Sequence, residues 1–209
     1  MAVAKLRAEA GLDYFELVPD ETGDALNSAV GVTVPSRFYL RLAREGLIEL
    51  DAPLRWLWRN PDRTPPDFVR TVDVVRLVSE QVKEIYEAHL GAADAVQWLP
   101  AILELPDGSE AAHWVPHFPI HHDVLSDRGT TWGVNGVPMR YAYSRAKLEG
   151  HAVTTYAERP SVVPLPDGST ASIPSMSSVR TQVIAAVVAD SLRDAATTGA
   201  RVFPAPLDV

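Results

Sequence analysis

Histidine is the residue type whose clustering in this sequence points most directly to chemistry. Four of the six histidines lie between His113 and His122, and Asp123 follows directly. Neutral imidazole and carboxylate groups are ligands that Zn²⁺ and Fe²⁺ accept in proteins. One hypothesis is therefore a metal-dependent enzyme built on the segment from His113 to Asp123.

The spacing of these side chains opposes a shared metal ion. Alternate side chains of an extended segment share one face, which would collect His113, His117, His121 and Asp123. Residues four apart on a strand are about 13 Å apart, too far to bind one ion. A helix would bring them closer, but the prolines at 116 and 119 oppose a helix here. A half-exposed strand or a surface facing a partner protein fits the segment better, and we expect no metal and no other cofactor.

Other catalytic signatures are missing from the sequence. It contains no Gly-x-Ser-x-Gly elbow, no Walker-type Gly-Lys-Ser/Thr and no Gly-x-Gly-x-x-Gly. The glycine-rich stretch 129–136 lacks the lysine of a phosphate-binding loop. Cysteine is absent, which excludes disulfides, thiolate metal sites and cysteine nucleophiles. These observations favour a protein that is not an enzyme.

The charge balance narrows the class of partner. The formal net charge is -8 and the sequence pI is near 5.2. Nucleic-acid binding normally needs a basic surface, because phosphate neutralisation supplies most of the affinity. Nucleic acid is therefore disfavoured. An acidic surface suits a basic protein partner through electrostatic steering, although the ordinary acidity of many proteins explains the same composition.

The elements that would position these residues follow a recurrent pattern. It consists of a strand, a short helix and a glycine at the helix end. Ser79 and Asp190 are predicted N-caps of two such helices, over residues 80–90 and 191–198. A third predicted helix covers 37–45, and the glycines that end the three helices are Gly46, Gly91 and Gly199. The predicted strands cover 30–36, 47–50, 72–78, 95–100, 183–188 and 201–204.

Two Pro-Asp-Gly turns predict hairpins, at 106–108 and 166–168. Trp56 and Trp58 lie two apart, so a strand would place both on one side, either in the core or as an interface hot spot. Together these features predict an α+β fold with a mixed or antiparallel sheet, hairpins and short strand–helix–strand units. We expect one domain over 1–209, with an N-terminal subregion at 1–60 and the best candidate break at 60–66.

The N-terminus has no apolar stretch long enough for a signal peptide. The longest apolar run, 183–189, is far shorter than the roughly 20 residues of a membrane span. We therefore expect a cytoplasmic protein with no membrane partner.

An ordered set of short motifs resembles a known family. They are Pro66-Asp67-Phe68, Val78-Ser79-Glu80, Val96-Gln97-Trp98-Leu99-Pro100, Asp123-Val124-Leu125-Ser126-Asp127, and a C-terminal strand and helix ending in Gly199-Ala200-Arg201-Val202-Phe203. In this order they resemble the bacterial polymorphic-toxin immunity proteins of family eleven, formerly a domain of unknown function, over residues 66–204. The loop 129–144 has no counterpart in that pattern.

The resemblance implies a non-catalytic cytoplasmic protein that neutralises a cognate, often basic, toxin by masking its active or essential surface. The candidate partner-binding residues lie in one segment: His121, His122, Asp123, Asp127, Arg128 and Trp132. Two other hypotheses stay open, the metal-dependent enzyme and a scaffold domain of a larger secretion or contact system.

Overall fold

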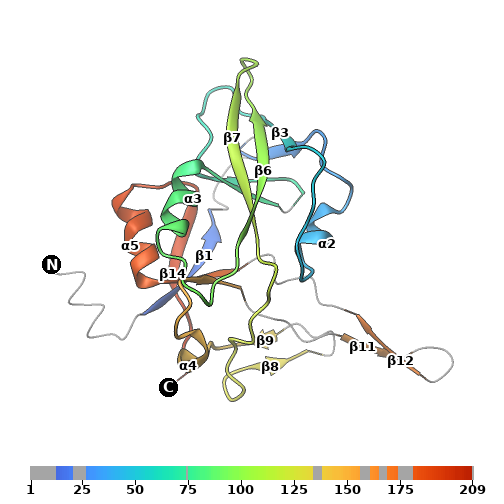
Figure 1. The fold of residues 1–209 in the computed structure, drawn as a ribbon, viewed down its shortest axis with the longest axis vertical. Helices are drawn as coiled ribbons and strands as arrows, with labels where there is room; N and C mark the ends of the chain where they lie inside the picture. The colour runs from blue at the N-terminus through green and yellow to red at the C-terminus, as the bar shows by residue number, and fades with distance from the viewer. Residues whose placement is uncertain are drawn as a thin grey trace.

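The computed structural model describes residues 13–20, 27–73, 75–133, 138–155, 161–164, 169–173 and 181–208. The fold is α+β, as the sequence predicts, with mixed and antiparallel sheets (Figure 1). None of the helices in these ranges is long and apolar enough to cross a membrane.

The largest sheet is a nearly closed barrel. Its strand order is β2 (Ala29–Gly31), β3 (Leu54–Trp58), β6 (Gln97–Glu104), β7 (Glu110–His117), β5 (Arg76–Val78) and β4 (Phe68–Arg70). β3 and β6 are parallel, whereas the other neighbours are antiparallel. A bridge between Ala29 and Thr71 joins the two ends of the sheet. The loop 60–66, predicted as a candidate break, therefore connects two strands of one sheet.

The barrel interior explains the tryptophan spacing. Trp56 and Trp58 are both buried on β3, at 0% and 2% exposure, whereas Leu57 between them faces outward. The interpretation of these tryptophans as an interface hot spot is therefore wrong, because burying them completes the core. The predicted turn at 106–108 connects β6 to β7 in a long hairpin.

A second sheet lies beside the barrel, with the order β10 (Val153–Thr154), β13 (Gln182–Ala185), β1 (Tyr14–Pro19) and β14 (Ala200–Pro204). Its core includes side chains from α3 (Glu80–Glu87) and α5 (Ala186–Asp194), and these two helices lie side by side (Figure 1). Ser79 caps α3, accepting from the Val82 N–H at 3.4 Å, as predicted. The Ser79 hydroxyl also donates to Asp67 at 2.8 Å, which fixes the start of α3 against β4.

The remaining elements are short. α2 (Phe38–Leu42) packs on the barrel, and α4 (Arg145–Leu148) follows the ladder of β8 (Thr131–Trp132) and β9 (Pro138–Arg140). β11 (Ser161–Pro164) and β12 (Thr170–Ile173) pair antiparallel, which confirms the second predicted hairpin. Its Pro-Asp-Gly turn falls outside the described residues.

Several predicted boundaries are wrong, and packing explains the largest error. α5 begins at Ala186, so Asp190 lies inside the helix, paired with Arg193 at 2.8 Å, and the N-cap position is Ala185. The second half of the predicted strand 183–188 is helical because Val188, with the nearby buried side chains of α5, packs into the second core. After α5, Ala196 adopts a left-handed conformation at φ 52°, and the predicted glycine, Gly199, also has a positive φ, of 86°.

The other boundary errors shorten, shift or remove predicted elements. The predicted helix 37–45 is only α2, because Arg37 adopts a left-handed conformation at φ 60° and cannot be a helical residue. Gly46 has the expected positive φ, whereas Gly91 does not. The predicted strand 30–36 corresponds to β2 and the predicted strand 72–78 to β5, and both observed strands are shorter. The predicted strand 95–100 corresponds to β6, which starts later. Residues 47–50 form no strand.

Candidate functional site

The predicted partner-binding segment leaves the barrel after β7 and runs toward α4. Its apolar residues form its base, since Val124 and Leu125 are buried at 1% and 2% exposure. The Val124 carbonyl accepts from the Ser144 N–H at 2.9 Å, and Leu125 forms a bridge with Tyr143. The segment is thus held by backbone hydrogen bonds and by packing, and its charged residues face solvent.

The two aspartates of this segment share one lysine. Lys147 Nζ, on α4, lies 2.9 Å from an oxygen of Asp123 and 3.5 Å from one of Asp127. It also donates to the Leu125 carbonyl at 3.0 Å. The hydrogen bond to Asp123 is the main reason that the pKa of Lys147 lies above its usual value. The aspartate side chains are 71% and 73% exposed, against 31% for Lys147, so the carboxylates form the outer surface.

A tyrosine pair fixes the same region to the second sheet. The hydroxyls of Tyr141 and Tyr143 both donate to one oxygen of Glu16 on β1, each at 2.8 Å. The two rings meet edge to face, with centroids 5.6 Å apart. Trp132 is half-buried and packs against the same apolar cluster, whereas Arg128 is exposed. The acidic pair therefore lies on a base connected to β1 and β8.

The adjacent histidines belong to a different environment. The His122 ring contacts that of His151 at a tilt, with centroids 4.4 Å apart and planes inclined at 52°. His151 Nδ1 lies 3.1 Å from Asp94, whose carboxylate also accepts the N–H groups of Gly91 and Ala152. Burial, followed by the charge of His151, lowers the pKa of His122, so the ring is neutral near pH 7. His121 uses its backbone N–H, which donates to Glu45 at 3.1 Å.

The first two histidines of the run are core residues. His113 and His117 lie on β7 and are 6% and 1% exposed. His117 Nε2 lies 2.7 Å from the Gly46 carbonyl oxygen, and burial lowers the pKa of both rings. The structure thus separates residues that are neighbours in sequence. Within the described ranges, no three histidine, aspartate or glutamate side chains are placed to hold a metal ion.

One cavity beside this run is small. It has a volume of about 20 Å³ and its lining includes His121, Arg76, Thr155 and Gln182. That volume suits about one water molecule, whereas pockets for small organic ligands measure roughly 300–1,000 Å³. This cavity is therefore no site for an organic substrate.

Sequence reasoning selected this segment as the candidate site but did not indicate the residues that organise it. Lys147, Asp94 and His151 are each separated by at least 20 residues from the side chains that they contact. No local motif marks them, because their role depends on the tertiary fold.

Neither the comparison with protein-family models nor that with curated proteins found a match for this chain. The resemblance to the immunity family therefore rests on the ordered motifs alone.

Proposed function

We propose that this chain is a non-catalytic immunity protein that binds a cognate bacterial toxin and masks its active or essential surface. The observation that carries the proposal is the exposed pair Asp123 and Asp127, held at a fixed position by Lys147 above a buried base. The proposed partner is a protein with a basic surface, neither a nucleic acid nor a membrane. The proposed compartment is the cytoplasm.

The chemistry of the pair suits recognition of a cation. Two carboxylates and one ammonium leave a net negative charge, and the carboxylates are more exposed than the lysine. An approaching Lys or Arg of the partner would form charge-assisted hydrogen bonds without first reorganising the segment. The net charge of -8 would accelerate the encounter at low salt.

The test uses the product of the neighbouring open reading frame as the toxin. That product should stop growth when expressed alone and permit growth when expressed with this chain. The double variant Asp123→Asn/Asp127→Asn should weaken the complex about 5- to 30-fold, because two exposed ion pairs contribute roughly 0.5–1 kcal/mol each. The matched control Asp51→Asn/Asp62→Asn removes equal charge from other exposed loops and should change the affinity less than about twofold. Absence of both growth rescue and a complex would refute the proposal.

A further inference from the structure

The small cavity beside the histidine run lies where the barrel meets the second sheet. Its volume is about 20 Å³, and its lining includes Arg76 of β5, Gln182 of β13 and Thr155, which follows β10. The β10–β13 ladder pairs Thr154 with Val183, so Thr155 and Gln182 come next on these two neighbouring strands. A particle bound in this cavity would therefore contact both sheets at once.

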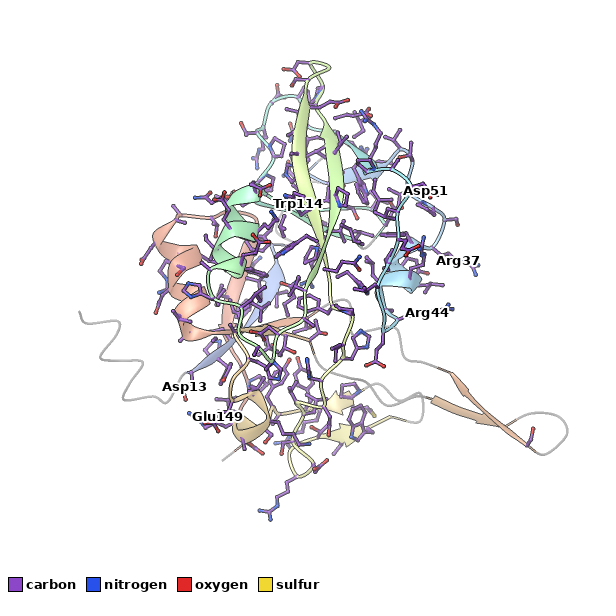
Figure 2. The ribbon with its side chains drawn as sticks, in the orientation of Figure 1. Asp13, Arg37, Arg44, Asp51, Trp114 and Glu149 are labelled. Carbon is purple, nitrogen blue, oxygen red and sulfur yellow. The ribbon has the colours of Figure 1, made fainter. Side chains whose placement is uncertain are left out.

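Strand pairing places Arg76 at the cavity. β7 contacts β5 through the pair Val78–Trp114, and Figure 2 labels Trp114 beside α3. Two residues further along, Arg76 comes level with Pro116, which also lines the cavity. One N–H of Arg76 donates to the Leu17 carbonyl of β1 at 3.4 Å. A guanidinium carries five N–H donors, and this bond uses one of them.

The Thr155 side chain is the observation that points to a ligand. Thr155 is 3% exposed, and its Oγ1 atom is buried without a hydrogen-bond partner among the described residues. A buried hydroxyl without a partner is costly, so native proteins rarely retain one that neither a water molecule nor an ion satisfies. The cavity volume of about 20 Å³ exceeds the roughly 10–15 Å³ that one water needs, which leaves room for a slightly larger particle.

The polar groups of the lining are mainly hydrogen-bond donors. The side-chain oxygen of Gln182 accepts from the Tyr86 hydroxyl at 2.8 Å, which leaves the amide NH₂ group as the other polar end of Gln182. A guanidinium can only donate, and a hydroxyl can donate. Burial raises the pKa of Tyr86, and the positive charge of Arg76 opposes this rise. The charge of Arg76 thus acts at the Tyr86–Gln182 pair.

The charge at the cavity is positive on balance. Arg76 is charged, and none of the lining residues in the described ranges is an aspartate or a glutamate. Burial lowers the pKa of His121, so this lining residue is neutral near pH 7. The exposed Glu45 contacts the His121 backbone, where its oxygen accepts the N–H at 3.1 Å. A positive cavity rich in donors suits a small anion better than a cation, or than a water molecule, which also needs acceptors.

We infer that this cavity binds one small monovalent anion, a chloride ion, between Arg76, Gln182 and Thr155. The anion would accept hydrogen bonds from the barrel and from the second sheet and would stabilise the contact between them. Hydrogen bonds to a charged acceptor are roughly twice as strong as neutral ones. The inference goes beyond the proposed function and does not depend on it, because the ligand stabilises the fold whatever partner the protein binds.

The first experiment compares chloride with sulfate at matched, moderate ionic strength. General salt effects favour sulfate, which strengthens apolar burial, but sulfate is too large for a cavity of about 20 Å³. We expect the full-length protein to melt about 2–4 °C higher in chloride than in sulfate, with a dependence on chloride concentration that saturates. Equal melting temperatures, or a higher one in sulfate, would assign the cavity to water and would overturn the inference.

Bromide locates the site, because it replaces chloride and gives an anomalous X-ray signal. Crystals grown in bromide should show an anomalous peak within hydrogen-bond distance of Thr155 Oγ1 and of the Arg76 guanidinium. Anomalous peaks confined to other parts of the molecule would contradict the inference.

Variants with matched controls test the individual donors. Thr155→Val should raise the chloride concentration at half of the melting-temperature increase at least about tenfold, since the anion loses a hydrogen bond. Thr131→Val makes the same change at an exposed threonine of β8 and should alter that concentration less than about twofold.

Arg76→Met should abolish the chloride effect, whereas Arg70→Met, at the exposed residue opposite Arg76 in the β4–β5 ladder, should retain it. If Arg76→Met does not fold, Thr155→Val decides the question alone. An unchanged chloride dependence in folded Thr155→Val would overturn the inference.

Discussion

Gly199 lies against Pro66 and the start of β4, and its replacement by alanine should destabilise the fold through two separable effects. Its φ is 86°, a left-handed conformation that costs an L-residue about 1–2 kcal/mol. A Cβ atom here would lie 2.4 Å from the Phe68 carbonyl oxygen and 2.8 Å from Cβ of Pro66. Forcing these backbone segments apart adds about 1–3 kcal/mol, as overpacking does in cores. Gly199→Ala should therefore lower the free energy of unfolding by about 2–5 kcal/mol.

Gly150 provides a matched control. Its φ is 87°, but a Cβ atom there meets nothing within 4 Å. Gly150→Ala should therefore show the conformational cost alone, about 1–2 kcal/mol. Urea denaturation followed by circular dichroism gives both free energies from the two midpoints and slopes. Equal destabilisation by the two substitutions would refute the assigned close approach of Gly199 to β4.

Three further predictions concern the core and the helix cap. Ser79→Ala should lower the free energy of unfolding by about 1–2 kcal/mol, because α3 loses its cap and Asp67 loses a hydrogen bond; urea denaturation measures it. Tyr143→Phe should lower it by about 1–3 kcal/mol, since a buried hydroxyl no longer donates to Glu16, and an unchanged value would contradict the assigned bond. Burial lowers the pKa of His113 and of the other histidines of the run in the folded protein. Below about pH 6.5 the unfolded chain therefore binds more protons than the folded one, so the melting temperature should fall as the pH drops. His113→Leu should flatten this slope, and an unaltered slope would count against the buried neutral ring.

Local patterns in the sequence predicted the features that depend on neighbouring residues. The Pro-Asp-Gly turn at 106–108, the Ser79 cap and the shared face of Trp56 and Trp58 all depend on contacts within a few positions. The start of α5 could not be predicted in this way, because Val188 fits a strand or a helix equally well. Its packing against the second core decides the outcome.

In the candidate site too, the sequence indicates some residues, whereas others are brought in only by the tertiary fold. The exposed aspartates of residues 121–132 are visible in the sequence, but the lysine that holds them comes from α4. The histidine run looks like one chemical unit in sequence, yet β7 ends at His117, and His122 is directed toward His151. Strand pairing likewise makes neighbours of Val30 and Leu57, which no sequence motif connects.

The most direct test of the proposed function is the salt dependence of association with the neighbouring gene's purified product. Stopped-flow rates would be compared for the unmodified chain, for Asp123→Asn/Asp127→Asn and for Lys147→Met, which removes the shared cation and should change stability by less than about 1 kcal/mol. We expect association at low salt to slow in the asparagine variant and to accelerate in Lys147→Met, with the three rates converging at high salt. Indistinguishable rates and salt slopes for all three proteins would contradict a binding surface formed by this carboxylate pair.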